Sequence, residues 1–221
     1  MMLAHPQMDS VICVDAERVC TLVLENPPFF RKLLRDIHQQ IRGFPGETVL
    51  SKNDVPVDFG KNAEIIDSFL SFEICRKNLI TKIISHMESV AVDELHYMKT
   101  ASMLGKLEQY LAELSFDLPC SIVCDKLSIG GVIKSAGIAI SDDYGNDLER
   151  LLDYMELIRE LERDKLFIFV NLRSYYSDDD ISAFLDSVLQ HAYQVLLIDG
   201  VSRKKLQNEQ RTTIDMDLCE F

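Results

Sequence analysis

Two short runs made only of apolar residues, 166–170 and 195–198, constrain the fold of this chain most strongly. A strand that is apolar at every position is buried on both faces, which is typical of central strands in a parallel sheet. Segments with the helical spacing of apolar residues flank and separate the two runs. Helix and strand therefore alternate, and the pattern predicts an α/β fold with a mostly parallel sheet.

The N-terminal part predicts a helix over residues 27–42 between short strands. Asn26 is suited to cap this helix, and Pro27 and Pro28 fit its first turn, where no N–H group is needed. The apolar residues that follow recur at the spacing of one buried helix face. Further helices are expected at 129–135, 146–163 and 179–191, and further strands at 11–14, 19–24, 48–50, 121–124 and 213–218.

The middle of the chain, residues 63–114, has no strand pattern and a single glycine, Gly105. Its apolar residues form three stripes at helical spacing, with a break near Asp93, which can cap a new helix. The sequence therefore predicts a separate helical leg over residues 63–114 and an α/β head made of residues 1–62 and 115–221. A helix pair of this kind packs well only against another surface, so oligomerisation is expected.

The composition excludes several classes of protein. Hydrophobic residues make up 47% and charged residues 27% of the chain, as in a soluble globular protein. The longest apolar run is far shorter than the roughly 18 residues of a membrane span. The N-terminus carries no readable secretory signal. We therefore expect a cytoplasmic protein without a membrane partner.

The six cysteines include no Cys-x-x-Cys pair and are interpreted as buried, reduced thiols. Cys120 and Cys124 are expected to face inward on one strand, with a metal or redox role as the less favoured alternative. The five histidines show no zinc-ligand spacing.

One half of a nucleotide-binding motif is present. Asp199 ends an apolar strand, a position from which nucleotide hydrolases hold magnesium at the carboxyl edge of a sheet. A phosphate loop would need Gly-x-x-x-x-Gly-Lys-Ser/Thr. The two Gly-Lys pairs, Gly60-Lys61 and Gly105-Lys106, lack both the first glycine and the final hydroxyl residue. Asp199 is thus interpreted as a turn residue before Gly200, and no motif indicates an enzyme.

Several stretches, taken in order, resemble a family of ring-forming accessory proteins of type II-A CRISPR adaptation, which act with the integrase when new spacers are acquired. The terminal motif and the Phe-Val-Asn strand are the most specific, whereas the helical leg matches by pattern alone. The resembling stretches are residues 25–31, 46–51, 116–118, 133–138, 166–172 and 214–221.

The resemblance implies a head whose sheet is related to P-loop-type folds but lacks the phosphate loop, together with a helical leg. It further implies a homotetrameric ring, stabilised by calcium, that threads double-stranded DNA ends without sequence preference. No catalysis and no nucleotide are implied. The partners implied are the CRISPR integrase complex and the RNA-guided effector nuclease.

The net charge of −13 should repel DNA, but a ring can place its cations inward, and the local field then decides binding. Contacts of this kind position the duplex without reading bases. The candidates for phosphate contacts are Lys52, Arg76, Lys77, Lys82, Lys126, Lys134, Arg203 and Lys204.

The chain departs from the family pattern in the segment that the resemblance implies for calcium binding. The segment after the helical leg is rich in acidic residues in the family, whereas here Asp117 and Asp125 alone match acidic positions. Three alternatives follow: weaker calcium binding, binding by other carboxylates, or none. We hypothesise that packing by Ile122, Val123 and the cysteines replaces part of the structural role of the metal.

Three readings of function stay open. A DNA-end-binding ring in CRISPR spacer acquisition is favoured. A nucleotide-binding or hydrolysing enzyme on the same sheet, with Asp199 as metal ligand, is the first alternative. A protein-interaction module that does not bind DNA is the second.

Overall fold

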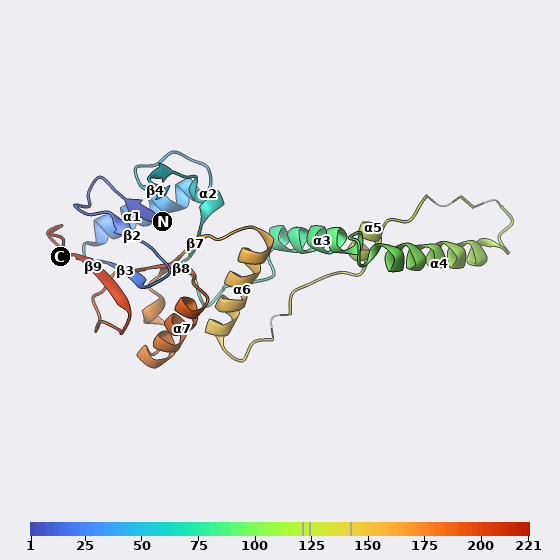
Figure 1. Ribbon diagram of the computed structural model, residues 1–221. Helices are drawn as coiled ribbons and strands as arrows, with labels where there is room; N and C mark the ends of the chain where they lie inside the picture. Colours follow the sequence, from blue (N-terminus) through green and yellow to red (C-terminus); the bar gives the residue numbers. More distant parts are fainter. Residues whose placement is uncertain (121, 124, 142) are drawn as a thin grey trace. The chain divides into compact units, whose positions relative to one another are not determined.

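The computed structural model describes residues 1–120, 122–123, 125–141 and 143–221 (Figure 1). The chain divides into two compact units. Unit 1 comprises Met1–Phe72 and Tyr144–Phe221, and unit 2 comprises Glu73–Asp143. These boundaries differ from the expected leg of residues 63–114 at both ends.

The centre of unit 1 is a five-stranded sheet in which every pair of neighbours is parallel. The strand order is β6-β7-β8-β3-β9. This confirms the predicted α/β class with a parallel sheet. The strands are β3 (Val19–Leu24), β6 (Ala63–Ile66), β7 (Leu166–Val170), β8 (Gln194–Asp199) and β9 (Glu209–Ile214).

The side chains of the central strands alternate between two buried faces, as the strand repeat requires. On one face Leu22, Ile168 and Ile198 join a core cluster with Leu33 and Ile37 of helix α1 (Pro27–Ile41). On the other face lie the rings of Phe167 and Phe169, which pack edge-on against Tyr193 and Phe184. All of β7 is buried, and so is β8 except for Gln194 at its start, so the predictions from the two apolar runs are confirmed.

Unit 1 also contains two long helices that follow the linker from unit 2 and strand β7 in sequence. They are α6 (Asp147–Leu161) and α7 (Asp178–Gln190), preceded by the short 3-10 helix η1 (Leu172–Ser174). Their buried residues recur at three and four residues, as expected for one apolar face.

A small antiparallel sheet, in the order β2-β1-β4-β5, completes unit 1. Asp36 of α1 fixes the chain that enters β4, because its carboxylate accepts hydrogen bonds from the backbone N–H groups of Glu47 and Thr48. The remaining elements of the unit are β1 (Met2–Ala4), β2 (Ile12–Cys13), β4 (Val49–Lys52), β5 (Val55–Pro56) and α2 (Phe59–Asn62).

Unit 2 is helical. It contains α3 (Lys77–Ala91), α4 (Tyr97–Ser115) and α5 (Ile129–Ser135). The predicted break near Asp93 is confirmed, since the Asp93 carboxylate accepts hydrogen bonds from the backbone N–H groups of Leu95 and His96. In α4 no residue is buried. Among the described residues, no helix is long and apolar enough to cross a membrane.

Several local predictions are wrong. Residues 63–66 form strand β6 rather than the start of a helix, because they pair in parallel with β7 at the sheet edge. The last strand lies at Glu209–Ile214, several residues before the expected 213–218. The expected strand at 121–124 lies partly outside the described residues, and residues 122 and 123 are not in a strand.

The expectation of buried thiols is confirmed for Cys20 but not for the other cysteines that the structure describes. Cys13, Cys75, Cys120 and Cys219 are exposed. Ile122 and Val123 are 47% and 91% exposed. Within the single chain these two side chains therefore do not make the packing that the hypothesis expects, and the hypothesis stays a prediction.

Candidate nucleic-acid interface

The position where a phosphate loop would stand is occupied by a very short connection. Only Glu25 and Asn26 lie between β3 and α1, whereas a phosphate loop spans about eight residues. The Asn26 side chain accepts the hydrogen bond of the Phe29 N–H at 3.0 Å. Pro27 and Pro28 have no N–H to offer. This helix start therefore presents none of the free N–H groups that bind phosphate.

Asp199 lies at the carboxyl end of β8, as predicted, next to the end of β3. Only 4% of its surface is exposed, and burial raises the pKa of its carboxyl to about 6. Beside it the Asn171 side chain accepts a hydrogen bond from the Gly200 N–H at 2.9 Å. The ring of Phe30, from the first turn of α1, packs close to Gly200. This edge of the sheet is thus filled by side chains of the chain itself.

Two of the predicted phosphate contacts, Arg203 and Lys204, lie in the segment 200–208 that connects β8 to β9. With the adjacent Lys205 they form a run of three exposed cationic residues. We call residues 203–205 the basic run. Lys52, the other candidate in unit 1, is exposed on β4 and does not belong to this run.

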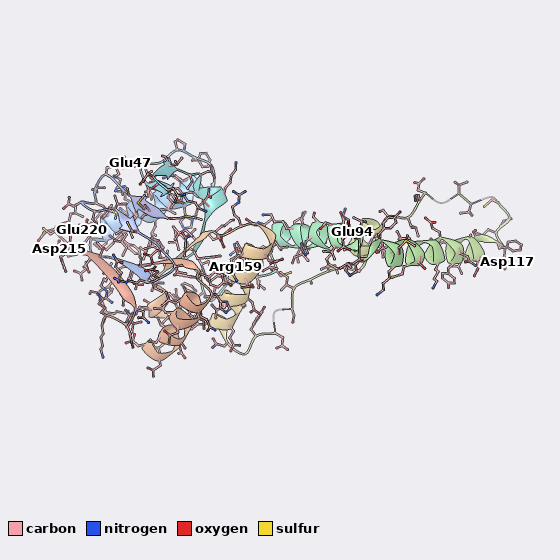
Figure 2. All side chains as sticks on the ribbon, in the orientation of Figure 1. Glu47, Glu94, Asp117, Arg159, Asp215 and Glu220 are labelled. Carbon is pink, nitrogen blue, oxygen red and sulfur yellow. The ribbon has the colours of Figure 1, made fainter. Side chains whose placement is uncertain are left out.

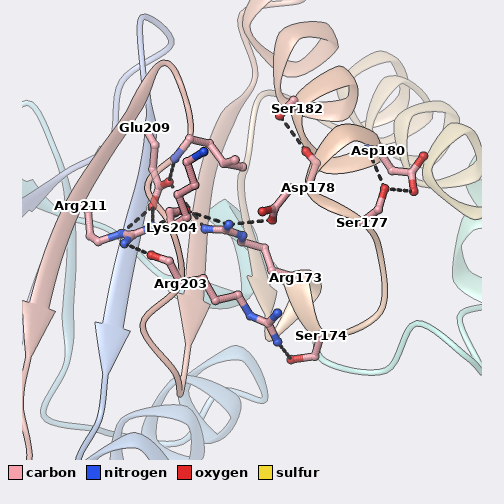
Figure 3. Close-up of polar contacts among 11 residues, drawn as sticks. Arg173, Ser174, Ser177, Asp178, Asp180, Ser182, Arg203, Lys204, Glu209 and Arg211 are labelled. Carbon is pink, nitrogen blue, oxygen red and sulfur yellow. Dashed lines mark hydrogen bonds and ion pairs between the residues drawn. The ribbon is translucent and has the colours of Figure 1, made fainter.

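The basic run is held by neighbouring charged side chains, two of which are buried (Figure 3). Arg173, which follows β7 in helix η1, has a side chain that is 1% exposed, and so has Glu209 at the start of β9. Arg211 forms a 2.7 Å ion pair with Glu209. Arg173 donates a 2.8 Å hydrogen bond to Asp178, which lowers the pKa of the Asp178 carboxyl. The connecting segment is therefore built on a charged cluster.

The other five predicted contacts belong to unit 2. Arg76 stands just before α3, and its Nε donates to the Glu73 carbonyl at 3.2 Å. Lys134 on α5 forms an ion pair with Glu88 on α3, with 3.4 Å between Nζ and Oε1. Lys126 lies in the segment that precedes α5. Lys77 and Lys82 are on α3. The five candidates are therefore spread over several elements of unit 2.

Asp117 and Asp125 are the predicted metal positions. Figure 2 labels Asp117 just past the end of α4. Asp125 lines a cavity of about 370 Å³ together with Glu108, but one Glu108 oxygen already accepts the Leu127 N–H at 3.1 Å. Within the described ranges, the structure brings together no group of three or more His, Cys, Asp or Glu side chains suited to a metal. The described donors do not fit calcium, which takes about six to eight oxygen ligands.

Sequence reasoning did not select three residues of the cluster in unit 1. Lys205 belongs to the basic group Arg203-Lys204-Lys205 of the sequence, but it is not among the predicted phosphate contacts. Arg173 stands among uncharged neighbours, and Arg211 has a single charged neighbour, Glu209, two residues before it. The roles of both arginines depend on the approach of β9 to η1, which the sequence does not show. On α4, Lys99 and Lys106 are two further exposed cations.

Fold and site together define a class: an α/β protein with a parallel five-stranded sheet, a filled phosphate position and a helical second unit. The sequence profile of the CRISPR-associated protein family Cas_Csn2 matches residues 44–218, and the chain belongs to this family. It is 20% identical over 208 residues to the CRISPR-associated protein Csn2 of Enterococcus faecalis, covering 91% of this chain and 90% of that protein.

A solved structure shows the same fold. The crystal structure of Stu0660 of Streptococcus thermophilus superposes with a TM-score of 0.58 at 11% identity, covering 97% of this chain and 74% of that one. Family membership implies a role in CRISPR adaptation, and hence in antiviral defence. This confirms the family predicted from the resemblance.

Proposed function

We propose that the protein is a non-catalytic DNA-binding ring that holds double-stranded DNA ends during CRISPR spacer acquisition in the cytoplasm. The observation that carries the proposal is the exposed basic run of residues 203–205, in a chain whose net charge is −13. Cations gathered on one surface of an acidic protein attract the DNA backbone locally. Phosphate contacts of this kind give binding that is independent of sequence and steeply dependent on salt.

The filled phosphate position supports the non-catalytic part of the proposal. An enzyme that bound a nucleotide on this sheet would need N–H groups at the start of α1, where Asn26 and two prolines stand instead. Asp199 is then left without a phosphate to act on. We therefore propose that the protein takes no nucleotide and that the integrase complex and the effector nuclease perform the chemistry.

The exposed apolar residues of α4 support self-association, and the homotetramer is the assembly that the family resemblance implies. Met103, Leu107, Tyr110 and Leu114 recur at the spacing of one helix face, and each is at least 37% exposed. A second copy of the same chain would cover such a face by knobs-into-holes packing. Sedimentation velocity on the wild-type chain would give the mass of the assembly.

The deciding experiment is a gel shift that compares linear duplex DNA with closed circular DNA of equal length. Each is tested with calcium and with chelator over a range of salt. A threaded ring binds only the linear form, and a bulky protein on each end blocks that binding. Because the described carboxylates do not fit calcium, we expect the binding to persist in chelator.

Other outcomes would change the proposal. Equal binding to both DNA forms would contradict threading and favour an open groove. No binding to either form at low salt would contradict DNA binding and favour a protein-interaction module that uses α4. Hydrolysis of a nucleotide by the purified chain would favour the enzyme alternative.

A further inference from the structure

The segment that joins β8 to β9 is held at three backbone positions by charged side chains (Figure 3). The carbonyl of Arg203 accepts a hydrogen bond from the Arg211 guanidinium. The carbonyl of Lys204 accepts one from Arg173 Nη2 at 2.9 Å. The N–H of Leu206 donates to Glu209 Oε2 at 2.7 Å. Surface connections usually leave these groups to water, so this segment is unusually fixed.

Glu209 links the two arginines. Its Oε1 accepts a 2.8 Å hydrogen bond from Arg211 Nε, and its Oε2 lies 3.7 Å from Arg173 Nη1. Both side chains of the latter pair are 1% exposed. A buried carboxylate between two guanidiniums keeps the cluster in place, because Glu209 would otherwise be a buried charge without a partner.

Arg173 is poorly explained by stability alone. The described residues offer its Nε and Nη1 no hydrogen-bond partner, and burial of an incompletely paired guanidinium is costly. Its Nη2, by contrast, makes two good contacts, one to Asp178 and one to the Lys204 carbonyl. The best-satisfied part of this side chain thus holds the backbone of the basic run.

The backbone contacts leave the side chains of the basic run free for a ligand. Residues 203–205 are exposed, and Arg203 makes one long contact, 3.3 Å to the Ser174 hydroxyl. A loop that is ordered before binding loses less conformational entropy when the ligand arrives. Three adjacent cations on a fixed backbone suit successive phosphates of one nucleic-acid strand.

We propose that residues 200–208 form a preorganised phosphate-contact loop for duplex DNA, with Arg173 and Arg211 as its positioning residues. The inference rests on the proposed function, since it assumes that the basic run meets the DNA backbone. It goes further in assigning a role to two arginines that do not themselves contact the ligand.

The first arm of the test follows the loop without DNA. Hydrogen exchange of the backbone amides at 201–206 is compared between the full-length wild type and Arg173→Met. We expect faster exchange of the Leu206 amide in the variant, because Glu209, which accepts its hydrogen bond, loses the neighbouring Arg173 charge and the Lys204 carbonyl keeps only the 3.4 Å contact to Arg211. Arg159→Met is the matched control: Arg159 also holds a carbonyl, that of His191 at 2.8 Å, but no basic run follows it. It should leave exchange at 201–206 unchanged.

The second arm measures affinity for a linear duplex. Arg173→Met should weaken binding roughly tenfold, as expected when a few ordered side chains become mobile, whereas Arg159→Met should not. In the triple variant Arg203→Gln/Lys204→Gln/Lys205→Gln, the cationic side chains of the basic run are gone. Adding Arg173→Met to it should then have no further effect, because coupled residues are not additive. A merely structural role would give additive losses.

The outcomes separate the two proposals. Faster loop exchange in Arg173→Met, together with a wild type that does not bind DNA, would overturn the proposed function and the phosphate-contact role, and would leave only the ordering of the loop by Arg173. A wild type that binds DNA, with unchanged exchange and affinity in Arg173→Met, would overturn the positioning role. Additive losses would overturn it as well. If Arg173→Met does not fold, Arg211→Gln enters the same cycle, since Arg211 is 12% exposed and holds the Arg203 carbonyl.

Discussion

Helices of unit 1 and of unit 2 share the same spacing of apolar residues, but they differ in how far the apolar face is buried. In unit 1, α6 and α7 bury their apolar faces, and the two central strands are buried at nearly every position. In unit 2, α4 is four residues longer than α6 (19 against 15), yet none of its residues is buried. Periodicity therefore predicts a helix, but it does not tell whether the apolar face meets a partner within the chain.

The difference in packing has an energetic consequence. A side chain of unit 1 such as Phe169 is fully buried and contacts the rings of Phe69 and Phe184. In unit 2, a cavity of about 410 Å³ separates parts of α3, α4 and α5, and Phe116 is 87% exposed. The stability of unit 1 should thus depend on its own core, and that of α4 on contacts made by assembly.

The largest effect on stability is expected when one phenyl ring is removed from each unit in turn. Phe169→Ala should lower the free energy of unfolding by about 3–5 kcal/mol, because it leaves a cavity in a packed core. Phe116→Ala should change it by no more than about 0.5 kcal/mol. Urea unfolding of the two variants gives both values. Equal losses would break the comparison, because the end of α4 would then have to be packed.

The fold of unit 1 was largely predictable because its signals are local. Apolar runs indicate buried strands, and Asn26 with two prolines indicates a helix start, which the structure confirms. Strand β6 was missed because its four residues, Ala63–Ile66, also fit a helical stripe, and only pairing with β7 decides between the two. The positioning arginines were not predicted because their contacts also come from the tertiary fold. Arg173 acquires its role through Glu209 and the Lys204 carbonyl, which are far away in sequence.

A second test compares two carboxylates within unit 1. Burial opposes ionisation of Asp36, but hydrogen bonds from Thr48, Glu47 and Gln40 outweigh it and lower the pKa of this carboxyl. Asp36→Asn should therefore cost about 2 kcal/mol at pH 7, as expected for bonds to a charged acceptor. The wild type keeps this contribution above about pH 4, the unfolded value, and loses it as the pH falls through the lowered pKa of the folded state.

Asp199 should behave in the opposite way. Burial raises its pKa to about 6, so the folded state disfavours its charge, and stability falls as the pH rises from about 4 through 6. Asp199→Asn should thus be at least as stable as the wild type at pH 7. Chemical denaturation between pH 3 and pH 8 follows both variants. A large loss in Asp199→Asn at pH 7 would mean that the ionised carboxylate has a partner worth more than its burial costs.

The smallest expected effect on stability concerns unit 2 and is the most informative about binding. Lys134 is 66% exposed, and its ion pair with Glu88 spans 3.4 Å. Because exposed pairs contribute little, Lys134→Gln should change the free energy of unfolding by less than about 0.5 kcal/mol. If Lys134 contacts a phosphate, the same variant should reduce the slope of log affinity against log salt by about one. Glu88→Gln removes the same pair but keeps the cation, so it should leave the slope unchanged or steeper. A reduced slope in Lys134→Gln alone would assign this exposed cation of unit 2 to DNA rather than to the fold.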